Sequence, residues 1–148
     1  MWNEVVDEND LKCFMNKMGS FHDSCIKELR YISGAYVEEN LSMYPLNDKR
    51  ILDVIIQRQF EDMSMIEMQF IGLKYLKLYP CAEEYTCEIL DSTMIFKDDS
   101  IYWCDCGEIS ESDFEEYEGT LICASKLRWR SVENKMGQED FYIARQID

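Results

Sequence analysis

Several segments of this chain alternate apolar and polar side chains, and the linkers between them are too short to contain crossover helices. In residues 50–60, Leu52, Val54 and Ile56 share one face, whereas Asp53 lies on the other. This period of two predicts a strand with one buried face and one partly wet face. Parallel neighbours need crossovers of a dozen or more residues, so the short linkers predict antiparallel pairing.

Other segments repeat the pattern. In the first of them, Leu29 and Tyr31 alternate with Glu28 and Arg30. Gly72 interrupts another segment and predicts a bulge that turns Leu73 and Tyr75 toward the core. The further strands are expected at residues 24–37, 66–75, 87–96, 100–104 and 121–132, with a turn-rich linker at 38–49 and a short edge strand at 141–143.

One helix is expected at the N-terminal end, over residues 10–18. Its apolar residues Leu11, Phe14, Met15 and Met18 are spaced i, i+3, i+4 and i+7. Asn9 or Asp10 can cap its start, and Gly19 can end it in the left-handed conformation. The pattern as a whole predicts an α+β fold: a mainly antiparallel sheet of about six strands with this helix packed on it.

Length and composition fit one domain covering residues 1–148. Apolar residues make up 47% of the chain and aromatic residues 13%, which is enough for a packed core. The opening sequence has no basic or apolar export signal, so we expect a cytoplasmic protein whose seven cysteines are reduced. Trp103 and Trp129 are expected in the core, and Cys87, Cys104 and Cys123 are expected to be core or near-core strand residues.

The charge is strongly acidic, with 30 Asp and Glu against 15 Lys and Arg. Residues 105–118 hold seven acids and no base; we call this stretch the acidic segment. Such a surface repels phosphate backbones and anionic lipids, which argues against nucleic-acid and membrane binding. It favours a basic protein as the partner.

The single histidine, His22, suggests one possible catalytic arrangement. The string Phe21-His22-Asp23-Ser24 contains the residue types of a hydrolytic triad, but adjacent residues cannot converge on a substrate. The alternative is a small hydrolase in which Cys25 and His22 meet in space, or in which two carboxylates share a cleft. The competing interpretation of this string is a polar turn between helix and strand.

No metal or cofactor is expected. Cys81 and Cys87, and likewise Cys104 and Cys106, lack the C-x(2–4)-C spacing of structural zinc sites. Glycine-rich phosphate loops are also missing from the sequence.

A basic stripe of Lys126, Arg128 and Arg130 follows one face of the strand at residues 121–132. In an acidic protein this stripe favours cross-strand pairing with acids on the same sheet face over nucleic-acid binding.

The turn Gly19-Ser20-Phe21-His22-Asp23-Ser24 before the first long strand, with the late run Lys126-Leu127-Arg128-Trp129, resembles sequences of a known group. This group consists of small uncharacterised bacterial proteins classed with the immunity proteins of polymorphic toxin systems. The resemblance covers roughly residues 19–130. It implies a non-catalytic cytoplasmic protein that binds and neutralises one cognate toxin.

Together with the charge, the resemblance predicts a protein-binding inhibitor of a basic toxin such as a nuclease, whose phosphate-binding groove carboxylates can imitate. Phe114 and Tyr117 would then be aromatic anchors within the acids. The alternative for the acidic segment is a solvated loop. The predicted partner-binding residues are Asp105, Glu108, Glu111, Asp113, Phe114, Glu115, Glu116 and Tyr117.

A third hypothesis is a structural homo-oligomer. It rests on tyrosines beyond those that a core of this size requires, some of which could line an interface between copies. They are Tyr31, Tyr36, Tyr44, Tyr75, Tyr79, Tyr85 and Tyr102.

Overall fold

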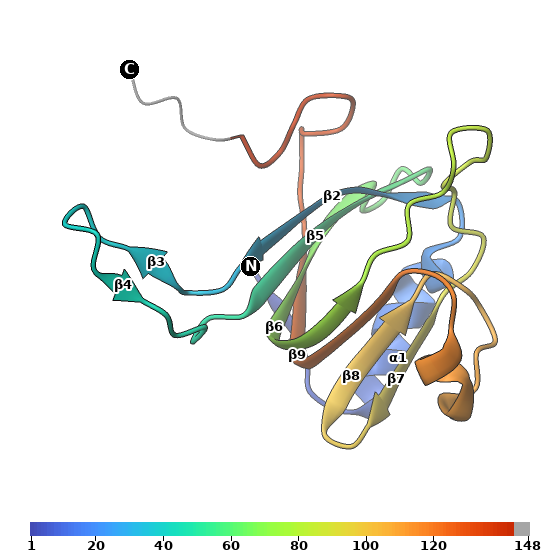
Figure 1. The fold of residues 1–148 in the computed structure, drawn as a ribbon. Helices are drawn as coiled ribbons and strands as arrows, with labels where there is room; N and C mark the ends of the chain where they lie inside the picture. Colours follow the sequence, from blue (N-terminus) through green and yellow to red (C-terminus); the bar gives the residue numbers. More distant parts are fainter. Residues whose placement is uncertain (144–148) are drawn as a thin grey trace.

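The computed structural model describes residues 1–143, and most of its strands form one open antiparallel sheet (Figure 1). These strands are β1 (Asn3–Val5), β2 (Ser24–Ile32), β5 (Ile51–Arg58), β6 (Met65–Lys77), β7 (Thr93–Lys97), β8 (Ser100–Cys104) and β9 (Leu121–Ser131). Their order is β2-β5-β6-β9-β8-β7, with β1 added along β9. With the N-terminal helix α1 (Glu8–Lys17), this sheet confirms the predicted α+β fold.

Helix α1 begins two residues earlier than expected, at Glu8. The Asp7 carboxylate accepts a hydrogen bond from the Asp10 amide at 2.8 Å, so Asp7 is the N-cap and the predicted cap at Asn9 or Asp10 is wrong. Gly19, with φ of 57°, follows the helix in the left-handed conformation as predicted. Within residues 1–143, no helix is long and apolar enough to cross a membrane.

The main core lies between α1 and one face of the sheet, which we call the helix face. Phe14 stacks on Trp129 with ring centroids 4.9 Å apart, and Phe21 packs edge-on against Trp103 at 5.8 Å. Both tryptophans are buried, as predicted. Cys104 and Cys123 are buried as well, but Cys87 is exposed on the loop before β7, so its predicted position in or near the core is wrong.

The predicted strand at residues 24–37 is broken after Ile32. The chain then forms a separate two-stranded arm from β3 (Tyr36–Val37) and β4 (Met43–Tyr44), which projects away from the sheet (Figure 1). Gly34 makes the break, because its φ is 103° and a Cβ there would lie 2.2 Å from Asp48 Oδ1. The expected linker at residues 38–49 therefore contains a strand.

The sheet face opposite α1 was expected to be partly wet, and this is confirmed for its arginines, since the Arg30 and Arg130 side chains are 48% and 39% exposed, but not for the centre of β5. Asp53 and Ile55 on this face are 1% and 0% exposed. The chain from residue 134 to residue 143 returns along this face, and Gln57 Nε2 donates to the Gly137 carbonyl at 3.2 Å. The edge strand predicted at residues 141–143 does not form, because the Phe141 and Tyr142 amides donate to the Glu28 carboxylate instead of to a neighbouring strand.

Gly72 has a φ of 68°, and the pairing of β6 with β9 shifts register just beyond it, between Leu73 and Tyr75. The predicted bulge is therefore present. Leu73 packs against the core as expected, whereas Tyr75 is 41% exposed.

Strands β7 and β8 form the predicted hairpin, although β7 begins at Thr93 rather than at residue 87. Asp98 and Asp99 occupy the turn with φ of 51° and 57°, which is the positive-φ pair that a tight two-residue hairpin requires.

Candidate functional site

The acidic segment connects β8 to β9 and is anchored to the protein from within. Its middle forms a short 3₁₀ helix, η2 (Glu111–Glu116), whose Phe114 is 1% exposed. Phe114 packs with Cys104 and Leu121 in a second small core. The segment is therefore a folded element with Phe114 as an internal anchor.

Two further predicted residues are also engaged inside the protein. The Tyr117 hydroxyl and the Thr120 amide both donate to Asp105 Oδ1, the amide at 3.2 Å. Burial is the main cause that raises the pKa of Tyr117, and the hydrogen bond to Asp105 raises it further. This pair closes the loop around η2, so Tyr117 is only partly accessible and Phe114 is not accessible at all to a partner.

The other predicted residues point to solvent. They are Glu108, Glu111, Asp113, Glu115 and Glu116, and all five are exposed. The structure thus separates the predicted set into an inner group, Asp105, Phe114 and Tyr117, and an outer surface of carboxylates.

Beside the acidic segment lies a cavity of about 600 Å³, which we call the β2 groove. One wall is β2, at residues 26–29. The facing walls are residues 78–81, 86–89, 105–106 and 117–120. The groove therefore joins the edge of the sheet to the acidic segment, which are distant in sequence.

The charge of the β2 groove is unbalanced. Among the described residues, its lining contains one cation, Lys27, against four acids: Glu28, Glu88, Asp105 and Glu118. The Glu28 carboxylate already accepts hydrogen bonds from the Phe141 and Tyr142 amides. Burial raises the pKa of Glu28, but these two amides and Lys27 lower it by more, so the pKa is lowered overall. Glu88 and Glu118 are exposed, which leaves two carboxylates for a cationic partner.

The apolar part of the groove lining is partly exposed too. Leu78 and Tyr79 are 53% and 58% exposed, and Pro80 follows them. Leu29 contributes from the β2 side. Apolar side chains beside unpaired carboxylates are the surface elements that a basic peptide segment with hydrophobic residues can use.

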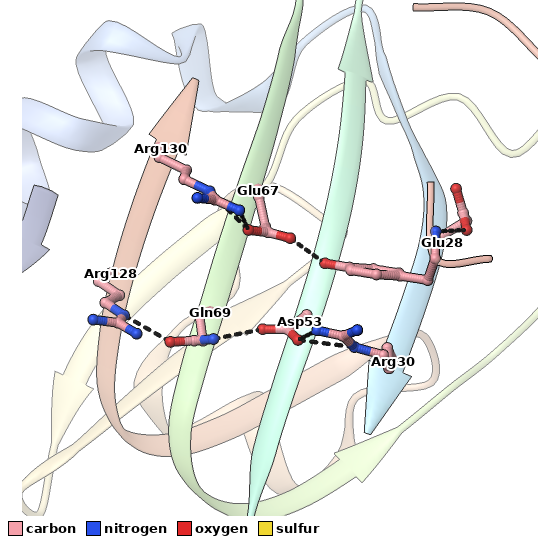
Figure 2. A network of polar contacts seen from close by, with 8 residues as sticks. Glu28, Arg30, Asp53, Glu67, Gln69, Arg128 and Arg130 are labelled. Atoms are coloured by element: carbon pink, nitrogen blue, oxygen red, sulfur yellow. Dashed lines mark hydrogen bonds and ion pairs between the residues drawn. The ribbon is translucent and has the colours of Figure 1, made fainter. Parts of the chain in front are cut away.

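A second polar arrangement lies on the sheet face opposite α1, which we call the polar face (Figure 2). Arg30 Nη2 lies 2.8 Å from Asp53 Oδ2, Gln69 Nε2 donates to Asp53 Oδ1 at 2.9 Å, and Arg128 Nε donates to Gln69 at 2.6 Å. These residues are direct cross-strand partners on β2, β5, β6 and β9. One row of side chains thus crosses four strands.

The next row contains the other buried acid. Arg130 Nε donates to Glu67 Oε1 at 2.9 Å, and the Tyr142 hydroxyl donates to the other oxygen of Glu67. The Trp2 ring lies 4.5 Å from both the Arg128 and the Arg130 guanidinium carbons. Each buried carboxylate is therefore paired and hydrogen-bonded, which is how a protein tolerates buried charge.

This network tests the predicted pairing of the basic stripe. Arg130 pairs with Glu67 on the same face, as predicted, but Arg128 bonds the neutral Gln69, and Lys126 lies opposite Ile71. Sequence reasoning did not single out Asp53 and Glu67 among the many acids. Their position within apolar strands, at alternating sites, was the available signal.

The predicted catalytic pair receives no geometric support. His22 is an exposed side chain whose Nδ1 lies 2.8 Å from Asp23 Oδ1. Within the described part of the chain, no hydrogen bond joins His22 to the Cys25 thiol, and burial raises the pKa of Cys25. A raised thiol pKa lowers the thiolate fraction that a nucleophile needs.

Metal ligands are not assembled in the region covered by residues 1–143, where no three His, Cys, Asp or Glu side chains form a group suited to a metal ion. Comparisons with known protein families, curated proteins and solved structures find no match for this chain. The function must therefore be inferred from the geometry of the molecule.

Proposed function

We propose that this protein is a non-catalytic binding protein for a basic protein partner, of the kind that immunity-type inhibitors of basic toxins represent. The observation that carries this proposal is the β2 groove, where a strand edge, exposed apolar side chains and the acidic segment adjoin one another. The resemblance of the 19–24 turn to immunity proteins points in the same direction. The partner binds along the groove and the outer carboxylates of η2.

Electrostatics supports a basic partner rather than a nucleic acid or an anionic membrane. The chain carries a net charge of −15, and the exposed acids of η2 have no lysine or arginine within the acidic segment. A field of this sign accelerates encounter with a cationic protein and slows encounter with polyanions.

The test is a pull-down from the native cell at low salt and at about 0.5 M salt, where surface charges are screened within a few ångströms. The retained protein is then studied with the double variant Glu115→Lys/Glu116→Lys. We expect capture at low salt only, and an association rate at least about tenfold lower for the variant.

The matched control is Glu38→Lys/Glu39→Lys on the β3–β4 arm. Both of these acids are exposed, and the substitution changes the net charge by the same amount. We expect this control to retain most of the association rate. Equal rates for the two double variants would show that the acidic segment is not the binding surface.

One observation favours a second function, that of a homo-oligomer subunit. The β3–β4 arm exposes several large apolar side chains: Tyr36 at 53%, Val37 at 54%, Leu41 at 82% and Met43 at 67%. Exposed apolar side chains clustered on a projecting element are typical of interfaces. A dimer mass in light scattering that reverts to a monomer in Leu41→Asp would favour this alternative.

A further inference from the structure

Within residues 1–143, strand β2 has no neighbouring strand on one side. It is the first strand in the sheet order, and β5 is the strand that pairs along it. The backbone amide of Arg58 in β5 donates to the Ser64 carbonyl, on the β6 side, at 2.7 Å. Backbone groups alternate in direction along an antiparallel strand, so the amides and carbonyls of Val54 and Leu52 also point toward β6.

The β2 residues opposite Val54 and Leu52 are Leu29 and Tyr31. Their amides and carbonyls must therefore point away from β5, toward the outer edge. In the described chain, no backbone hydrogen bond from a turn, loop or other strand reaches either residue. Leu29 and Tyr31 thus present unpaired backbone groups at the outer edge of β2.

One segment of the same chain, at Ile89, pairs with the start of this edge but does not continue along it. The Ile89 amide donates to the Ser24 carbonyl at 2.8 Å, which forms an isolated antiparallel bridge at the start of β2. Thr86 and Cys87, just before Ile89, instead line the opposite wall of the β2 groove. The groove therefore opens where the chain's own pairing with β2 ends.

The residues that line the groove indicate that it follows the strand edge. Four consecutive residues of β2, from Ile26 to Leu29, contribute to the lining. Successive side chains of a strand point to opposite faces, so a cavity that touches four in a row runs along the edge rather than over one face.

We propose that an extended basic segment of the partner binds in the β2 groove and continues along the edge of β2 as an added strand, with its backbone hydrogen-bonded to Leu29 in the groove and to Tyr31 just beyond it. This inference rests on the proposed function and specifies the mode of binding. The charge supports a basic segment, because within residues 1–143 the lining has a single cation, Lys27, while Glu88 and Glu118 are exposed acids. Addition of a strand to an open edge is a recurrent way of binding an extended peptide.

A second copy of this chain fits the edge less well. Two β2 edges brought together would each come from a chain of net charge −15, and like charges oppose such pairing. The register of β2 is also shifted between Ile26 and Glu28, which leaves Lys27 as a bulge. Bulges and lysines on an edge strand discourage indiscriminate pairing with other strands.

The experiment uses the full chain labelled with ¹⁵N and a ten-residue peptide of alternating Lys and Val, with the Glu-Val peptide as control. Hydrogen exchange of the Leu29 and Tyr31 amides is measured with and without each peptide. We expect the Lys-Val peptide to slow both amides by more than about tenfold, since a paired amide exchanges only on opening. The Glu-Val peptide leaves them unchanged.

Two substitutions separate the backbone from the side chain. Tyr31→Pro removes the outward amide, whereas Tyr31→Ala keeps it and removes only the ring. We expect Tyr31→Pro to bind the Lys-Val peptide about five- to tenfold more weakly than Tyr31→Ala, which corresponds to one net hydrogen bond. If Tyr31→Pro fails to fold, the hydrogen-exchange measurement on the unsubstituted chain decides whether the peptide pairs with β2.

The inference is overturned if the Lys-Val peptide does not bind, or if it binds without slowing exchange at Leu29 and Tyr31. The proposed function is tested separately by the association rates of the two double variants. A partner whose association depends on Glu115 and Glu116 but which leaves the β2 amides unprotected would refute the added strand and leave the proposed function standing.

Discussion

The two faces of the central sheet are stabilised in different ways by the same strands. On the helix face, Met68 and Phe70 of β6 are fully buried among apolar neighbours under α1. On the polar face, Glu67 and Gln69 of the same strand are held by charged and polar partners from β5, β9 and the C-terminal segment (Figure 2). The stabilisation from apolar burial depends on how much apolar surface is buried, whereas the stabilisation from each polar contact depends on the presence of one particular partner.

The polar face combines buried acids with half-exposed bases. Asp53 and Glu67 side chains are 2% and 5% exposed, but those of Arg30 and Arg130 are 48% and 39% exposed. The arginine heads therefore keep part of their hydration while they neutralise the carboxylates. A one-residue slip of register would separate these partners, so the polar face specifies strand pairing more than it adds stability.

The largest effect is expected on the helix face. Phe70→Ala removes a fully buried ring and leaves a cavity, so we expect the free energy of unfolding to fall by about 3–5 kcal/mol. Urea denaturation followed by tryptophan fluorescence measures this change. A loss below about 1 kcal/mol would mean that the core under α1 collapses easily and that the contrast between the two faces is wrong.

An intermediate effect is expected at the centre of the polar face. Asp53→Asn removes the charge that pairs with Arg30, and we expect a loss of about 1–3 kcal/mol, limited because Arg30 can turn to water. The control Glu38→Gln, at an exposed site, should stay within about 0.5 kcal/mol of the unsubstituted protein. Equal stabilities for both variants would show that the cross-strand row contributes nothing.

The smallest effect is expected where the C-terminal segment meets the polar face. Tyr142→Phe removes the hydroxyl that donates to Glu67, and at neutral pH we expect a loss of about 1 kcal/mol. Burial and the hydrogen bond to Glu67 raise the pKa of Tyr142 in the folded protein. In the unfolded chain a tyrosine ionises near pH 10.

The sign of the pH dependence follows from these two states. The folded state keeps the Tyr142 proton while the unfolded state loses it, so this contribution is complete below about pH 10 and is lost as the pH rises further. The stability difference between the unsubstituted protein and Tyr142→Phe should therefore shrink above pH 10. Tyr85→Phe, at a residue 72% exposed, is the control and should show no difference at any pH.

Local patterns predicted much of the fold. Alternation assigned Leu52, Val54 and Ile56 to the buried face, and the spacing of Leu11, Phe14 and Met15 located α1. These patterns succeed because side-chain direction depends on backbone geometry within a few residues. The β3–β4 arm was missed because the break at Gly34 depends on its contact with Asp48, which a period of two cannot reveal.

The candidate site was less predictable. The sequence located the acids of η2, and they are exposed. It also predicted that Phe114 contacts a partner, which would place this side chain at the surface, but Phe114 is buried. An aromatic residue among acids can face either way, and only the small core of Cys104 and Leu121 decides that it points inward. The β2 groove could not be predicted at all, because its walls come from five separate parts of the chain.

The sequence by itself determined the α+β class, the antiparallel pairing, the helix at the start and the strong negative charge, since each depends on composition or on neighbours along the chain. The tertiary structure decided which acids are buried and which are exposed, and which strand edge stays open. Asp53 and Glu118 are both carboxylates, yet one is enclosed by Arg30 and Gln69 and the other lines the β2 groove. Their difference arises only from what strand order and the returning C-terminal segment bring beside them, because burial is a property of the assembled fold.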